Sequence, residues 1–153
     1  MLETPHVVVG AAIAFKVGNP ALSLPLALGS HFILEKIPHW NPHLNTEKKK
    51  LGHISSKTFN IVLVDTLLAL VLGSVIAFLA YPDLTRVGII LFACFLSALP
   101  DLIEAPYFFL NKKSDFIKKW ITFKKSLQSD AEAFPGLATQ IITIIVAVWW
   151  ILG

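Results

Sequence analysis

Three ionisable residues recur at four-residue spacing near the end of an apolar stretch: His31, Glu35 and His39 in "SHFILEKIPHW". Residues four apart share one face of an α-helix, so His31 and Glu35 are expected to project together. Pro38 is expected to loosen or end the helix before His39. Imidazole and carboxylate groups form a ligand set suited to zinc and other divalent first-row metals. This spacing therefore favours a metal site.

Three acidic residues interrupt long apolar runs further along the chain. Asp65 lies in "FNIVLVDTLLALVLGSVIAFLAY", and Asp101 and Glu104 lie in "VGIILFACFLSALPDLIEAPYFFL". A carboxylate at the centre of a bilayer costs about 2.5–3.5 kcal/mol on insertion scales, so such residues usually face a bundle interior or a wet cavity. Counted along their helices, all three lie within about 15 Å of the same membrane side. His6 reaches that level if the first helix is re-entrant from this side.

The composition is that of an integral membrane protein. The chain has 55% hydrophobic and 15% charged residues, with a mean hydropathy of +0.68, whereas soluble domains carry about 25% charged residues. A bilayer span needs about 20 apolar residues, and three runs satisfy this, at 58–81, 85–110 and 135–152. The only cysteine, Cys94, excludes an internal disulfide. The N-terminus lacks the basic region that opens a secretory signal, so the first apolar segments are expected to remain in the mature protein.

The first forty residues predict a helical hairpin over residues 5–37. "PHVVVGAAIAFKV" would rise only about 20 Å as a helix, and "GNP" then breaks it. Broken helices are tolerated at membrane depth only when they pack against protein or line a cavity. We therefore expect one all-α membrane domain over residues 1–153, a bundle of about four spans with a broken or re-entrant N-terminal hairpin.

The lysines predict the orientation. Residues 36–57 and 111–134 hold eleven of the thirteen basic residues, and lysine-rich short loops stay on the cytoplasmic side. The loops 38–57 and 111–134 are thus expected in the cytoplasm, which indicates the cytoplasmic membrane of a prokaryote. The pI of about 9.1 is then a topology signal and not evidence for nucleic-acid binding.

The second loop, "SDFIKKWITFKKSLQSD", predicts an amphipathic helix that lies on anionic lipid headgroups of the inner leaflet. Lys124 interrupts its apolar arc, and a solvated basic loop is the alternative.

Each candidate also has an explanation without function. His39 beside Trp40 can be an interfacial residue, and Glu35 can pair with Lys36 at the surface. Asp101 can cap a helix that restarts after Pro100, and Asp65 can be a buried partner for a histidine. His43 and His53 lie in a polar loop, where solvation is expected.

Several short motifs resemble those of the YdjM-like membrane-bound metal-dependent hydrolases. They are "TPHVVVGAAIA", "SHFILEKIPHW" and "SALPDLIE". The resemblance implies functional roles for His6, His31, Glu35, His39 and Asp101. Two departures stand out: the family more often has Asp at the position of Glu35, and its Leu-Pro-Asp motif commonly continues to Asp and His, where this chain has Ile103 and Glu104.

Together these observations predict a metal-dependent hydrolase acting on a phosphoester or lipid-derived substrate, with zinc or manganese bound near the cytoplasmic face. A proton- or ion-coupled transporter and a structural membrane protein with buried polar pairs are the alternatives. In the hydrolase, Glu35 or Glu104 would be the general base. The expected metal ligands are His6, His31, Glu35, His39, Asp65 and Asp101.

Overall fold

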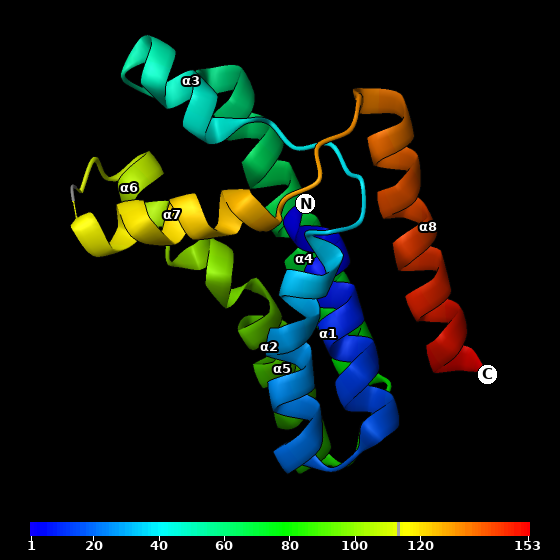
Figure 1. The fold of residues 1–153 in the computed structure, drawn as a ribbon. Coiled ribbons are helices and arrows are strands. Elements are labelled where there is room, and N and C mark those ends of the chain that lie inside the picture. The colour runs from blue at the N-terminus through cyan, green and yellow to red at the C-terminus, as the bar shows by residue number, and fades with distance from the viewer. Residues whose placement is uncertain (113) are drawn as a thin grey trace.

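The computed structural model describes residues 1–112 and 114–153, which form an all-helical bundle, as expected (Figure 1). The helices of this part of the chain are α1 (Glu3–Val17), α2 (Pro20–Leu34), α3 (Leu44–Leu51), α4 (Ser56–Phe78), α5 (Leu84–Leu102), α6 (Ala105–Phe109), α7 (Asp115–Leu127) and α8 (Ala133–Leu152).

Helix α1 is the centre of the bundle and packs against α2, α4, α5 and α8. Its buried positions carry mostly small residues, which let neighbouring helices approach closely in a membrane. Gly10 shows this most directly. A Cβ atom there would lie 2.6 Å from Ser97 Oγ and 3.0 Å from the Ala93 carbonyl oxygen of α5. The contact between α1 and α5 therefore requires glycine at this position.

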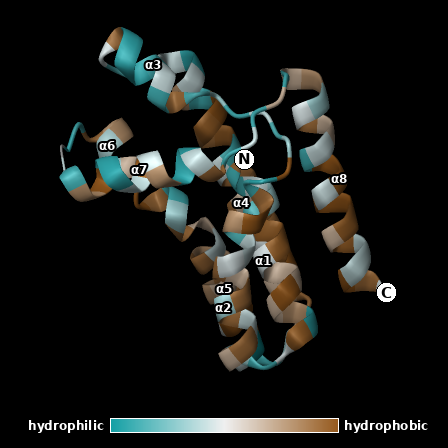
Figure 2. Ribbon diagram, in the orientation of Figure 1, coloured by the Kyte–Doolittle hydropathy of each residue, from teal (hydrophilic) through white to brown (hydrophobic). Residues whose placement is uncertain are grey.

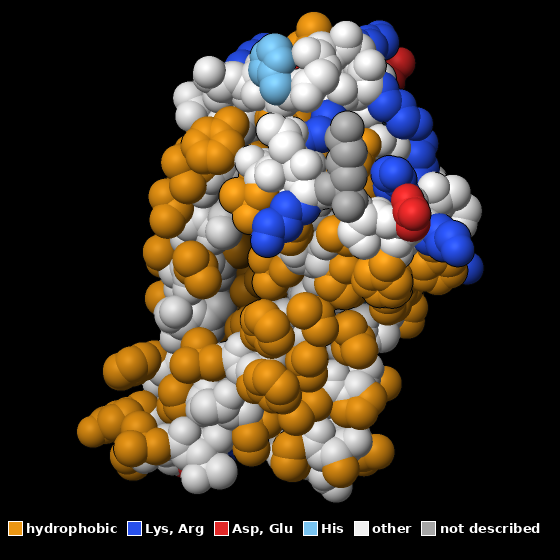
Figure 3. All heavy atoms as spheres, turned by 90° about the vertical axis from the view of Figure 1, so that its left-hand side faces the viewer, with side chains coloured by type: hydrophobic (Ala, Val, Ile, Leu, Met, Phe, Trp, Pro, Cys, Tyr) orange, Lys and Arg blue, Asp and Glu red, His pale blue; other side chains and the backbone are white. Residues whose placement is uncertain are grey.

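Three helices of the described chain are long and apolar enough to span a membrane: α4, α5 and α8. Helix α2 is apolar but shorter. Figure 2 shows hydrophobic residues along these helices, and Figure 3 shows hydrophobic side chains over most of one face of the bundle below a lysine-rich end. These features establish a membrane protein, because a soluble protein rarely exposes apolar patches of such extent.

The span expected over 85–110 is divided in the structure. Helix α5 ends at Leu102, and the short α6 begins at Ala105. Pro106 lies in the first turn of α6, where its fixed φ and missing N–H favour the start of a helix over its continuation. Pro100, in contrast, lies inside α5. Asp101 therefore caps no restarting helix, and Glu104 stands beyond the end of the span.

The N-terminal hairpin consists of α1 and α2. Gly18 joins them with a positive φ of 70°, and the Asn19 side chain accepts a hydrogen bond from the Ala21 N–H at the start of α2 (3.0 Å). Each arm has 15 residues and thus rises about 22 Å, less than the roughly 30 Å thickness of the hydrocarbon core. Helix α2 ends at Leu34, so His39 lies in the following loop, as expected from Pro38.

The two ends of the bundle differ in character. The N-terminus, α3, α6 and α7 lie at one end, while the turn after α1, the turn after α4 and the C-terminus lie at the other (Figure 1). Both lysine-rich segments therefore share one end, as the predicted topology requires. The amphipathic helix expected in the second segment forms as α7, which crosses the end of the bundle and exposes Phe116 and Phe123.

Candidate metal centre

Three of the expected ligands meet at the lysine-rich end: His6 of α1, His31 of α2 and Asp101 of α5. One nitrogen or oxygen atom from each lies within 4.8 Å of the others. The two imidazole rings stack with their centroids 4.0 Å apart, and neither histidine is exposed. His31 Nε2 lies 3.9 Å from Asp101 Oδ2. Residues up to 95 positions apart in the chain are thus brought to one point by three helices.

The tautomer of His31 follows from its hydrogen bond. Its Nδ1 lies 2.8 Å from the Ser97 carbonyl oxygen, which can only accept, so Nδ1 carries the hydrogen. The lone pair of the neutral ring is then on Nε2, which is buried and has no hydrogen-bond partner among the described residues. Nε2 faces the Asp101 carboxylate, which is also an acceptor. Two acceptors turned toward each other need a cation or a proton between them.

His6 is oriented in a similar way by Glu35. His6 Nε2 lies 3.3 Å from Glu35 Oε1, so Nε2 donates and the lone pair falls on the buried Nδ1, which has no partner within the described chain. Burial opposes ionisation of Glu35, but the hydrogen bond from His6 and the Met1 ammonium hold its pKa below the usual range. Metal-binding histidines commonly donate their second N–H to a carboxylate or carbonyl group. Glu35 thus positions His6 and lies outside the three-residue group.

His39 turns toward the same region from a loop. Its Nδ1 donates to the Ile37 carbonyl oxygen (2.7 Å), and its Nε2 lies 3.9 Å from Glu35 Oε1. The Met1 amino nitrogen lies between these groups, 2.6 Å from His39 Nε2 and 2.5 Å from Glu35 Oε1. The backbone of His39 pairs with residues 129–131, which holds this part of the loop in place. His39 and Glu35 therefore form a second polar pair beside His6, His31 and Asp101.

Asp65 has a different role from the one expected. Its Oδ2 accepts the Glu3 N–H at 2.5 Å, and its Oδ1 accepts the Thr4 hydroxyl at 2.6 Å and the Thr4 N–H at 3.3 Å. These backbone donors are the unpaired N–H groups at the start of α1. Asp65 therefore caps α1 from the neighbouring span, and both of its oxygens are engaged.

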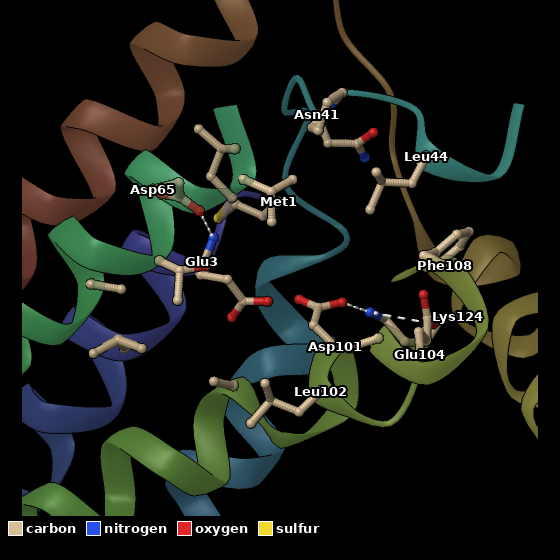
Figure 4. Close-up of a pocket in the computed structure, with 18 of the residues that line it drawn as sticks. Met1, Glu3, Asn41, Leu44, Asp65, Asp101, Leu102, Glu104, Phe108 and Lys124 are labelled. Carbon is tan, nitrogen blue, oxygen red and sulfur yellow. Dashed lines mark hydrogen bonds and ion pairs between the residues drawn. The ribbon is translucent and has the colours of Figure 1, made fainter. Parts of the chain in front are cut away.

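Lys124 of α7 is a site residue that the sequence reading missed. Only 7% of it is exposed, and its ammonium pairs with Asp101 Oδ1 and lies 3.5 Å from Glu104 Oε1 (Figure 4). Burial lowers the pKa of Lys124. Burial and the negative charge of Glu35 raise the pKa of Glu104 to about 8. The sequence did contain a sign of this role, because Lys124 interrupts the apolar arc of α7. A lysine on the inward face of a helix is rarely buried unless it is paired.

Glu3 was also missed. Figure 4 shows its carboxylate facing that of Asp101 across a pocket, and its Oε2 is buried without a hydrogen bond in the described residues. Glu3 and His6 are three residues apart, a spacing that places both on one face of a helix. His43 and His53, by contrast, are exposed in loops, as expected.

The pocket has a volume of about 430 Å³ and is lined at one end by Glu3, Asp101, Glu104 and Lys124. This volume lies within the range of about 300–1,000 Å³ typical of small-molecule sites. Asp101 is the member of the three-residue group that lines it. The pocket thus gives a ligand access to the side of the candidate metal centre.

The donor set fits a divalent metal. Two neutral imidazoles and one carboxylate match the three protein ligands common in catalytic zinc sites. The 3.9 Å between His31 Nε2 and Asp101 Oδ2 is within the roughly 4.2 Å that two bonds of about 2.1 Å can span. The cost of burying the acidic groups would be offset by the cation.

Comparison with known proteins adds no assignment, because no family model, curated protein or solved structure matches this chain. The resemblance to the YdjM-like hydrolases therefore rests on the short motifs quoted above.

Proposed function

We propose that this protein is a membrane-embedded metal-dependent hydrolase with His6, His31 and Asp101 as metal ligands. The observation that carries the proposal is the buried Nε2 lone pair of His31, fixed by the Ser97 carbonyl group and turned toward Asp101. Zinc or manganese would polarise the scissile bond and lower the pKa of a water molecule.

The protein side chains would orient the ligands and move a proton. Glu35 holds His6 through its Nε2–H, and Ser97 holds His31. Of the two expected bases, Glu104 fits better, since its Oε1 is buried without a hydrogen bond in the described chain and it lines the pocket beside Asp101. A pKa of about 8 is near the range that suits a general base at neutral pH.

The location is part of the same proposal. We propose that the protein lies in the cytoplasmic membrane of a prokaryote. The polar cluster would face the cytoplasm, because it lies at the end of the bundle that carries both lysine-rich segments, and such segments stay on the cytoplasmic side. Reporter fusions at Lys48 and Gly153 test this orientation. Lys48 is expected to report the cytoplasm, and Gly153 the opposite side.

One observation favours a second candidate, a structural network of buried polar pairs. Lys124 already neutralises one oxygen of Asp101, and this pair ties α7 to α5. In that case the cluster would bind no metal and would only hold the loops in place.

Elemental analysis of the purified protein in detergent separates the two candidates. We expect near-stoichiometric zinc or manganese in the wild type and in His53→Ala, whose histidine is exposed in a loop and does not line the pocket. We expect its loss in His31→Ala. A wild-type protein that stays metal-free after incubation with both ions would overturn the hydrolase and leave the structural network.

A further inference from the structure

We propose that the pocket is a binding site for a membrane lipid phosphoester, with an acyl chain between α4 and α5 and the phosphate at Lys124, Lys125 and the metal. This inference rests on the proposed function, because it names the substrate class of that hydrolase.

The deeper part of the pocket is an apolar trough within the membrane. One face of α4 and one face of α5 form its walls, and Val7 of α1 also lines it. From Asp65 to Gly73 the trough follows eight residues of α4, or about 12 Å. Gly73 packs closely against Val7 and Cys94, since a Cβ atom there would lie 2.8 Å from Val7 Cγ1 and 3.1 Å from Cys94 Sγ, so the trough is closed at this point on its inner side. The lining positions on the two walls are Val62, Thr66, Ala69, Leu70, Gly73 and Ser74 of α4, and Leu91, Cys94, Phe95 and Ala98 of α5.

The trough is accessible from the bilayer. Leu70 and Ser74 of α4 and Leu91 and Phe95 of α5 line it and are also exposed. Both helices are candidate membrane spans, so these exposed edges face acyl chains. A molecule that enters from the side would place apolar atoms in the trough while its polar part reaches Asp101 and Glu104. Only an amphipathic ligand matches both ends.

The charges at the polar end determine the headgroup. Lys124 and Lys125 line this end of the pocket, and lysine binds phosphate as a point charge. The acidic residues that line the same pocket outnumber these lysines; they are Glu3, Glu35, Asp65, Asp101, Glu104 and Asp130. An anionic headgroup is therefore attracted only when a divalent cation neutralises part of this charge. The preference for phosphate should thus depend on metal, whereas occupation of the trough by the acyl chain should not.

Photocrosslinking tests both the binding of an acyl chain in the trough and the metal-dependent preference for a phosphate headgroup. The probes are phosphatidic acid and diacylglycerol, each with a diazirine in one acyl chain, added to the purified protein in detergent. Labelled peptides are identified by mass spectrometry, and the outward face of α8 provides the reference for nonspecific labelling. With metal bound, we expect phosphatidic acid to label residues 66–74 and 91–98 about tenfold more than diacylglycerol does, a difference of about 1.4 kcal/mol. A chelator should remove this preference and leave diacylglycerol labelling of the trough in place.

A matched pair of variants tests the trough itself. Ser74→Trp places an indole at the exposed edge of the pocket and should lower trough labelling about tenfold. Val71→Trp changes an exposed position of the same helix that does not line the pocket, and should have no effect. Equal labelling of the trough and α8, or unchanged labelling in Ser74→Trp, would overturn the site.

The metal content of each preparation is measured separately. If phosphatidic acid and diacylglycerol label equally in metal-loaded protein, the lipid phosphoester is wrong while the metal centre stands. If no metal binds, the hydrolase fails, and trough labelling alone then supports or overturns the acyl-chain site.

Discussion

Asp65 and Asp101 are both aspartates of apolar helices, and both were expected to bind metal, yet their surroundings differ completely. Both oxygens of Asp65 accept hydrogen bonds from the first turn of α1. Asp101 faces the lone pair of His31 with one oxygen and the ammonium of Lys124 with the other. The comparison shows that the role of an acidic residue in a membrane helix depends on which hydrogen-bond donors and cations its neighbours provide.

The physical difference lies in the source of positive charge. The start of a helix presents unpaired N–H groups and the positive end of the helix dipole, so α1 stabilises the Asp65 carboxylate without a metal. His31 is a neutral ring whose only hydrogen donates elsewhere. In this tautomer it offers Asp101 no proton, so the two facing acceptor atoms are satisfied only by a further proton on His31 or by a cation such as the proposed metal. The same substitution, Asp to Asn, should therefore lower metal affinity at Asp101 and the stability of the fold at Asp65.

The largest effect is expected for Asp101→Asn. Changes in the groups around metal ligands alone cost about 10–100-fold in affinity, so loss of this direct ligand should lower metal affinity more than about 100-fold. Equilibrium dialysis against buffered zinc measures this. The free energy of unfolding should fall less than it would in Asp65→Asn, because the Lys124 ammonium still has Glu104 as an ion-pair partner. Wild-type affinity in Asp101→Asn would remove Asp101 from the metal centre.

Asp65→Asn should act on stability instead. The amide keeps one acceptor but turns an N–H₂ group toward the donors of Glu3 and Thr4, and it loses the charge that interacts with the helix dipole. We expect a loss of about 2–4 kcal/mol in the free energy of unfolding, seen as a lower midpoint of thermal unfolding in detergent. The metal content of the folded fraction should match the wild type. Metal loss without a change in the midpoint would instead make Asp65 a ligand.

Much of this architecture could be predicted from the sequence, because apolar runs and lysine distribution are properties of single segments. The all-helical bundle, the shared end of the lysine-rich segments and the amphipathic α7 followed in this way. The exception was the span over 85–110, where the effect of Pro106 was not recognised.

The site was predicted less completely, because it depends on contacts between segments. The convergence of His6, His31 and Asp101 was expected from their depth. The engagement of Asp65 by α1 could not be, since hydrogen bonds between helices leave no local pattern. Lys124 did leave a signal, as a charge on an apolar helix face.

A smaller effect is expected where α1 meets α5. Gly10→Ala places a methyl group against Ser97, whose carbonyl orients His31. Overpacking of this kind costs about 1–3 kcal/mol, and the shift of α1 should also weaken zinc binding, so this variant should affect both stability and metal affinity. Gly88→Ala is the matched control, since a Cβ there meets nothing within 4 Å. It should be neutral or stabilise α5 by up to about 1 kcal/mol.

The smallest effect concerns the pH dependence of stability through Glu104. Its pKa is raised in the fold from 4.5 to about 8, so between these values the folded state binds more protons at this residue than the unfolded state. The Glu104 contribution to stability is therefore fully present below about pH 4.5 and is lost as the pH rises through about 8. Glu104→Gln should remove this component, so that its thermal midpoint falls less between pH 5 and pH 8 than that of the metal-free wild type. Asp115→Asn changes an exposed acid of α7 and should keep the wild-type dependence of the thermal midpoint on pH. If Glu104→Gln also kept the wild-type dependence, the pKa of Glu104 would not be raised in the fold, and the prediction would be wrong.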